Sequence, residues 1–191
     1  MKVVGINGSP RKEGNTAILI KTVFKELEQQ GIETELIQLA GMNLRGCNAC
    51  KACETQGPQC AITEDSLNEC IAKMMSSDGI ILGSPVYSAS VTSQMKAFLE
   101  RAGKALKGKG ALKYKVGAAV SAVRRAGSMA TIDTMNHFML NKQMFVAGSS
   151  YWNMVYGRQI GEVEQDEEGM INMKNLGQNM AWLLKKIHGV S

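Results

Sequence analysis

A loop near the N-terminus carries residue types that bind phosphate. It spans residues 8–16, between an apolar, β-branched segment and a helical pattern, which predicts strand, tight loop and helix in that order. The start of a helix presents unpaired N–H groups and a partial positive charge, so it binds anions. Gly8 and Gly14 let the backbone turn tightly and approach a ligand. The side chains that can add hydrogen bonds to a phosphate are Ser9, Arg11, Asn15 and Thr16. The alternative is an ordinary turn in which Asn15 caps the helix.

A second group of reactive side chains lies in one short segment. Four of the five cysteines fall within 14 residues in the pattern C-x2-C-x2-C-x6-C, namely Cys47, Cys50, Cys53 and Cys60. This spacing fits the wrapping of a [4Fe–4S] cluster. Zinc is the main alternative metal, although structural zinc sites more often combine two distant CxxC pairs or use histidine. A loop of metal-free thiols is the other alternative. Cys70 falls in the apolar stripe of a predicted helix and is expected to be a small buried residue.

The rest of the chain supplies the elements that position these groups. Apolar strand patterns alternate with amphipathic helical patterns five times, which is typical of an α/β fold. The predicted strands cover residues 2–7, 34–39, 79–86, 116–123 and 143–148, and the predicted helices cover residues 16–30, 64–77, 90–107, 127–140 and 173–188. Residues 151–170 are expected to be irregular. We therefore predict a flavodoxin-like three-layer sandwich, with a five-stranded parallel sheet of order 2-1-3-4-5 and helices on both faces. Residues 1–191 are expected to form one domain, with a cysteine-rich loop inserted at about residues 44–62.

Ligands of such a sheet bind at the carboxyl ends of its strands, where the strand order reverses. Three loops should line that crevice: residues 9–16, residues 84–88 and residues 121–127. The first supplies anion contacts, the second an aromatic and apolar surface, and the third two arginines and a glycine. Together they suit a flat heteroaromatic ring that carries a phosphate. The sequence lacks both the P-loop pattern and G-x-G-x-x-G, which disfavours the corresponding nucleotide sites.

On these motifs the chain resembles the NADPH-dependent FMN reductase superfamily over about residues 1–150. The matching segments are Gly8-Ser9-Pro10-Arg11 with Gly14-Asn15-Thr16, then Gly83-Ser84-Pro85-Val86-Tyr87, and the loop at Arg124. The cysteine segment is similar to that of the iron–sulfur flavoprotein branch. The chain departs from this branch at residues 121–123, where the branch more often has a glycine-rich loop.

The resemblance implies which residues hold the cofactors. It implies that the FMN phosphate is bound by Ser9, Arg11, Gly14, Asn15 and Thr16. It implies that the ring and ribityl chain are wrapped by Pro85, Val86, Tyr87 and Ser88, and that the pyrimidine side is bordered by Ala122, Val123, Arg124 and Gly127. The implied [4Fe–4S] ligands are the four clustered cysteines, near the flavin edge. Catalysis would be centred on the flavin, without a catalytic side chain.

The resemblance also implies the activity, which is that of an FMN-dependent oxidoreductase. Electrons would come from NAD(P)H or ferredoxin and pass, through the cluster if it is present, to a small acceptor such as a quinone, a flavin or an oxygen species. The alternatives are a cluster-free NAD(P)H:flavin or quinone reductase and a non-enzymatic flavodoxin-like electron carrier. Relatives of this kind are homodimers or homotetramers.

The composition of the chain limits which binding partners and which cellular compartment are expected. The net charge of +5 is dispersed and only 5% of residues are aromatic, which argues against nucleic-acid binding. The sequence contains no apolar run of about 18 residues and no signal-peptide pattern. An odd number of cysteines argues against a disulfide framework. A cytoplasmic protein without membrane contact is therefore expected.

Overall fold

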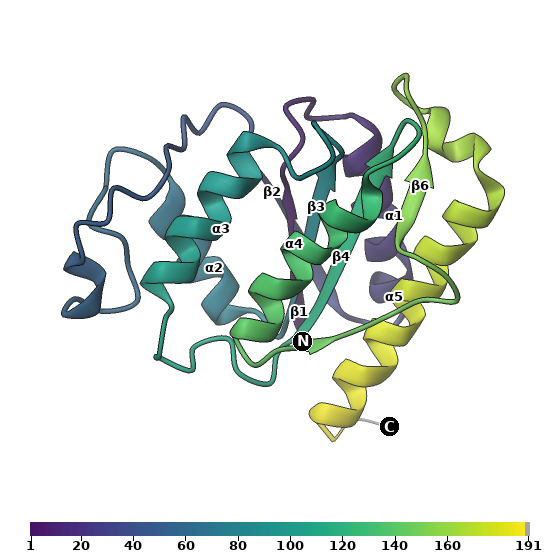
Figure 1. Cartoon of the computed structure of the whole chain (residues 1–191). Coiled ribbons are helices and arrows are strands. Elements are labelled where there is room, and N and C mark those ends of the chain that lie inside the picture. Colours follow the sequence, from purple (N-terminus) through teal and green to yellow (C-terminus); the bar gives the residue numbers. More distant parts are fainter. Residues whose placement is uncertain (190–191) are drawn as a thin grey trace.

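The computed structural model describes residues 1–189 and contains a parallel sheet flanked by helices (Figure 1). The sheet is built on β1 (Lys2–Asn7), which pairs with β2 (Glu33–Gln38) on one side and β3 (Gly79–Pro85) on the other. β4 (Val116–Val123) pairs with β3, and all of these pairings are parallel. The order β2-β1-β3-β4-β5 confirms the predicted topology.

Helices cover both faces of the sheet, as the alternating patterns predicted. They are α1 (Asn15–Gln29), α2 (Leu67–Ser76), α3 (Ser93–Ala105), α4 (Ser128–Asn141) and α5 (Glu167–Ile187). Each face of the sheet has its own buried apolar core. One core joins α1 and α5 to side chains such as Val3 and Ile81. The other joins α2, α3 and α4 to side chains such as Val4 and Ile80, which point to the opposite face because side chains alternate along a strand.

The fifth position of the sheet differs from the prediction. A continuous strand over residues 143–148 was expected, but β5 (Phe145–Val146) has two residues and pairs only with the start of β4. After residues 147–153, β6 (Met154–Tyr156) pairs in parallel with the end of β4. The fifth position is therefore shared by two short strands.

The prediction of an irregular segment over residues 151–170 was wrong. It contains β6, a 3-10 helix (Glu162–Gln165) and the start of α5, which begins at Glu167 and not at residue 173. The reason lies in a local cap: the side chain of Asp166 accepts a hydrogen bond of 3.0 Å from Gly169 N. Glu167 and Glu168 also favour a helix start by their charge.

The cysteine loop lies beside α2 and α3, on the opposite side of the molecule from α5 (Figure 1). It contains one short 3-10 helix (Ala52–Glu54).

None of the helices formed within residues 1–189 is long and apolar enough to cross a membrane.

Candidate functional site

The loop after β1 is held in shape by two side chains from the sheet. Asn7 is fully buried, accepts a hydrogen bond of 3.0 Å from Ser9 N and donates one of 2.7 Å to Gln38 Oε1. Gln38 in turn donates to Ser9 O at 2.7 Å. The main chain of Gly8 donates to Gly83 O at 2.8 Å, which ties the loop to the end of β3. The loop is therefore preorganised by its neighbours on both sides.

The start of α1 leaves polar groups available to a ligand. Its N-cap is Gly14, which has no side chain to occupy the first N–H groups, and its first turn contains no acidic residue. The Oγ1 atom of Thr16 is buried, yet it has no hydrogen-bond partner among residues 1–189. A buried hydroxyl without a partner is unfavourable. An anion at this helix start would satisfy it, and the exposed side chain of Arg11 lies in the same loop.

The side chain of Asn15 is hydrogen-bonded to a segment far along the chain. Its Nδ2 atom donates to Gln159 O at 2.8 Å, and its Oδ1 atom accepts from Gly161 N at 2.8 Å. Both ends of the amide are therefore occupied by the segment after β6. The backbone N–H of Asn15 and the second N–H of its Nδ2 atom remain for a ligand in this arrangement. The segment 157–161 thus belongs to the same edge, which sequence reasoning missed because the contact spans 144 residues.

The second loop follows β3 and is fastened to the first. Ser84 is buried, and its Oγ atom accepts from Thr92 N at 3.1 Å. Thr92 caps α3 and donates from Oγ1 to Gly8 O at 2.6 Å. In the loop between Ser84 and Thr92, Tyr87 and Ser90 exchange main-chain hydrogen bonds of 2.9 and 3.0 Å, so the chain makes a tight hairpin turn. Tyr87 is half exposed at this edge.

The third loop follows β4 and packs against the second. Gly127 has φ of +94°, and a Cβ atom placed there would lie 2.9 Å from both Ala89 Cα and Val86 Cγ1. Both the positive φ and the lack of space for a Cβ atom require glycine at this position. The side chain of Arg124 is exposed in this loop.

Two residues expected to border a ring lie within β4. Ala122 and Val123 are buried, and their carbonyl oxygens accept from Val86 N and Gly157 N, at 3.0 and 2.9 Å. Their side chains are therefore core residues, and Arg124 is the first exposed residue after the strand. Nearby, the buried Oγ atom of Ser121 has no hydrogen-bond partner within the described part of the chain.

The structure thus brings the three predicted loops to one edge of the sheet (Figure 1). The sequence profile of the family described as NADPH-dependent FMN reductase matches residues 1–159. The chain belongs to this family. The resemblance inferred from the motifs is confirmed, and the protein is an FMN-dependent reductase with a flavodoxin-like fold.

Curated relatives of this family member are named iron-sulfur flavoproteins. One from Methanocaldococcus jannaschii is 39% identical over 98% of this chain and 99% of its own length. Another from Methanosarcina thermophila is 31% identical over 98% of this chain and 97% of its own length. The similarity therefore extends over the cysteine loop as well as the sheet.

Solved structures confirm the fold of this FMN reductase. A flavone reductase superposes with a TM-score of 0.77 at 20% identity, covering 100% of this chain and 65% of that one. RosB, solved with a bound riboflavin phosphate intermediate, superposes with a TM-score of 0.76 at 18% identity, covering 99% and 81% of the two chains.

A second candidate site lies in the cysteine loop. Its four cysteines all line one cavity of about 90 Å³, together with Arg101 and Lys104 of α3. Cys47 and Cys50 are exposed, whereas Cys53 and Cys60 are half-buried. Within the described residues, no three side chains of Cys, His, Asp or Glu are already arranged to hold a single metal ion. The donor set nevertheless fits an iron–sulfur cluster, because such clusters are held by four thiolates.

Several contacts hold the cysteine loop against the fold. Lys109 Nζ donates to the carbonyls of Cys53, Gln56 and Gly57 at 2.9, 2.6 and 2.9 Å. Asn68 of α2 makes two hydrogen bonds with the main chain of Cys60, at 2.7 and 2.9 Å. The cysteines are thus presented by a loop that is anchored at two points.

Two residues of the cavity lining belong to α3, which begins after the loop that follows β3. Arg101 and Lys104 stand about 12–17 Å along α3 from its first residue, Ser93, at about 1.5 Å per residue. Cys70 lies outside this cavity. It is buried in the core, which confirms its prediction, and burial raises the pKa of its thiol to about 11.

Proposed function

We propose that this FMN reductase passes electrons between a [4Fe–4S] cluster in the cysteine loop and FMN at the carboxyl edge of the sheet, and then to a small acceptor. The observation that carries the proposal is that four cysteines from one loop line a single cavity. The names of the relatives from Methanocaldococcus jannaschii and Methanosarcina thermophila support it. The cysteines would bind the cluster as thiolates.

In this proposal, the loop after β1 binds the FMN phosphate. The unpaired N–H groups at the start of α1 and the orphaned Thr16 hydroxyl provide neutral donors, and Arg11 provides a charged one. Ser9 is buried and shapes the loop, because its Oγ atom accepts from Arg11 N at 3.1 Å. Asn15 contributes its backbone N–H and the Nδ2 hydrogen that does not bond Gln159 O.

The other two loops would hold the ring. Residues 85–88 offer an exposed tyrosine on a tight turn, and Arg124 adds positive charge beyond the end of β4. When bound, FMN supplies transfer of two electrons as hydride or of one electron at a time. A cation close to the ring favours the negative charge that the ring gains on reduction. Arg124 would therefore raise the reduction potential of FMN.

The proposed electron donors are NAD(P)H and ferredoxin, and the proposed acceptors are a quinone, a flavin or an oxygen species. The net charge of +5 suits an acidic donor protein such as ferredoxin. The family description supports a nicotinamide donor. Steady-state rates with NADPH, NADH and reduced ferredoxin, each with a quinone as acceptor, distinguish these donors.

The second candidate is a cluster-free NAD(P)H:quinone reductase. It is supported by the family description, NADPH-dependent FMN reductase. A spectrum and an iron assay of protein purified without air separate the two candidates. The cluster proposal expects broad absorbance near 400 nm, besides that of flavin, and about four irons per chain. Iron well below this amount after anaerobic treatment with iron and sulfide contradicts it.

We also propose a homodimer or homotetramer that works in the cytoplasm. Tyr151 and Trp152 support the assembly, because both side chains are more than half exposed beside the interrupted fifth strand position. Large exposed aromatic side chains in one segment are typical of a contact surface. Sedimentation equilibrium tests this directly, and a monomer at micromolar concentration contradicts it.

A further inference from the structure

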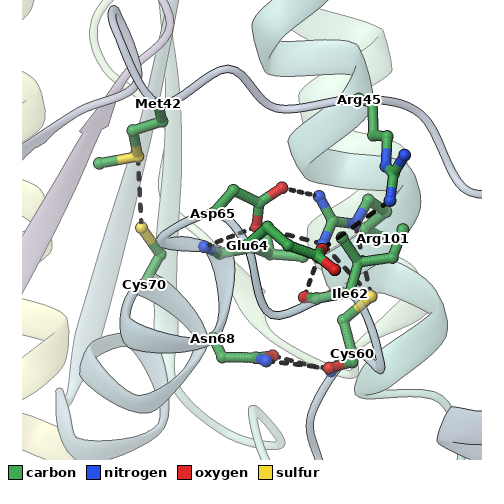
Figure 2. A network of polar contacts seen from close by, with 10 residues as sticks. Met42, Arg45, Cys60, Ile62, Glu64, Asp65, Asn68, Cys70 and Arg101 are labelled. Carbon is green, nitrogen blue, oxygen red and sulfur yellow. Dashed lines mark hydrogen bonds and ion pairs between the residues drawn. The ribbon is translucent and has the colours of Figure 1, made fainter.

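Arg101 is a charged residue buried inside the fold, with 1% of its surface exposed. It forms a forked ion pair with Asp65: Nη1 contacts Oδ2, and Nη2 contacts Oδ1 at 3.2 Å (Figure 2). Nη2 also donates to Ile62 O at 3.1 Å. Burying a charge is unfavourable unless it is paired and hydrogen-bonded. Burial alone lowers the pKa of Arg101, but the hydrogen bonds to Asp65 and Cys60 outweigh it and raise this pKa.

The same guanidinium also donates to a cysteine of the cavity. Its Nε and Nη2 atoms both lie 3.4 Å from Cys60 Sγ (Figure 2). Two hydrogen bonds from Asn68 hold the main chain of Cys60. The position of this sulfur is therefore fixed through both the backbone and the side chain of Cys60. Within residues 1–189, no side chain donates to the sulfur of the other three clustered cysteines.

We propose that Arg101 is a positioning residue that fixes the Cys60 sulfur and raises the reduction potential of a cluster bound by the four cysteines. This inference rests on the proposed function, because it requires the loop to hold a cluster. Reduction of such a cluster would add one electron and leave its bonds to the protein intact, so the sulfur ligands would become more negative. Hydrogen bonds to these sulfurs and nearby positive charge stabilise the reduced form more than the oxidised form.

Other charges around the cavity determine how much Arg101 raises the reduction potential of the cluster. The Asp65 carboxylate offsets part of the guanidinium charge, and Glu54 adds negative charge to the cavity lining. Lys51 and Lys104 add positive charge to the same lining. Arg101 differs from these two lysines because it is buried and its N–H groups point at a sulfur atom.

A purely structural role for Arg101 is the competing explanation. In that case the ion pair would only fasten α3 to the segment before α2, and breaking it from either side would have the same effect. The tuning role predicts opposite effects. Arg101→Gln removes a positive charge and the donors to sulfur, whereas Asp65→Asn removes the negative charge that offsets them.

The test uses protein treated anaerobically with iron and sulfide, followed by a redox titration with mediator dyes. In Arg101→Gln we expect the oxidised-to-reduced ratio of the cluster, at a fixed solution potential, to rise about tenfold, or about 59 mV for one electron. In Asp65→Asn we expect it to fall. The matched control is Arg45→Gln, which removes the same charge from an exposed pair with Glu64 at 3.8 Å and should change the ratio little.

Each outcome decides one point. Shifts of the same sign in both variants, or shifts no larger than that of the control, overturn the role of Arg101. If Arg101→Gln does not fold, Arg101→Lys replaces it: lysine keeps the charge but lacks the fork that reaches both Asp65 and Cys60. A smaller rise in the ratio is then expected, and an unchanged ratio overturns the inference. Wild-type protein that takes up no iron overturns the proposed cluster itself.

Discussion

Thr92 Oγ1 donates a hydrogen bond of 2.6 Å to the carbonyl of Gly8, a residue 84 positions earlier in the chain. The same oxygen accepts from Met95 N at 3.2 Å and so caps α3. One buried hydroxyl therefore joins the proposed phosphate loop to the loop that follows β3.

This link predicts a coupled loss in Thr92→Val. The variant leaves the Gly8 carbonyl and the Met95 N–H without a partner, which costs about 1–3 kcal/mol of unfolding free energy. FMN affinity should fall by up to about tenfold, because the phosphate loop loses a support. Urea unfolding and fluorescence titration with FMN measure the two effects. Thr92→Ser keeps the hydroxyl and should resemble the wild type, and equal losses in both variants contradict the argument.

Thr16→Val separates ligand binding from stability. In the FMN-free protein the buried Thr16 hydroxyl lacks a partner among residues 1–189, so its removal should leave the unfolding free energy unchanged or higher. FMN affinity should fall about tenfold, because a donor to the phosphate is lost. The control is Thr22→Val on the same helix, whose hydroxyl donates to Ile18 O at 2.9 Å. Unchanged FMN affinity in Thr16→Val rejects the proposed phosphate site.

Gly127→Ala tests the packing of the second loop against the third. The new methyl group would lie 2.9 Å from Ala89 Cα, and φ of +94° adds strain of about 1–2 kcal/mol. We expect lower stability and weaker FMN binding, because the two loops are pushed apart. Gly108→Ala is the matched control: its φ is +70°, and no described atom lies within 4 Å of the added carbon. It should show the strain, as a lower melting temperature, without the loss of FMN affinity.

Cys70 should resist alkylation while the protein is folded. It is 2% exposed, and burial raises the pKa of its thiol to about 11, so little thiolate forms at neutral pH. Iodoacetamide added to iron-free protein should modify the exposed Cys47 and Cys50 first. Peptide mass spectrometry follows each site, and unfolding in urea should release Cys70. Labelling of Cys70 at the same rate as Cys50 would show that the core opens readily.

Glu35 gives the stability a dependence on acid pH. Hydrogen bonds from Lys2 and Lys73, at 2.8 and 2.6 Å, lower the pKa of Glu35 below 4.5. A carboxyl group whose pKa is lower in the folded state stabilises the fold when the pH is above its pKa in the unfolded chain. This contribution is lost as the pH falls through its pKa in the folded protein. Glu35→Gln should therefore be less stable by about 0.5–1 kcal/mol at pH 7. This difference should shrink below about pH 4, as measured by urea unfolding across pH.

The order of the sheet and the positions of the three loops could be predicted from the sequence. β1, β3 and β4 are buried on both faces, so their apolar runs are easily recognised. The helical stripes and the glycine-bearing loops between them are also local signals. Because strand order follows from few rules, these signals were enough to place the loops at one edge.

The contacts that complete the sites could not be predicted in this way. β6 has three residues and exists because β4 offers an unpaired edge, which local patterns do not reveal. The two hydrogen bonds of Asn15 reach a segment that was expected to be irregular. Arg101 lies in a helix, where a charged residue usually faces solvent, and its burial depends on Asp65 being close in space.

The division of the fifth strand position also affects how the protein avoids aggregation. A long, flat edge strand offers a row of free N–H and C=O groups on which another chain can build a sheet. At this side of the sheet, β5 and β6 have two and three residues and are separated by residues 147–153. At the other side, β2 carries the charged residues Glu33 and Glu35. Both margins of the sheet are therefore poor templates for amyloid-like growth.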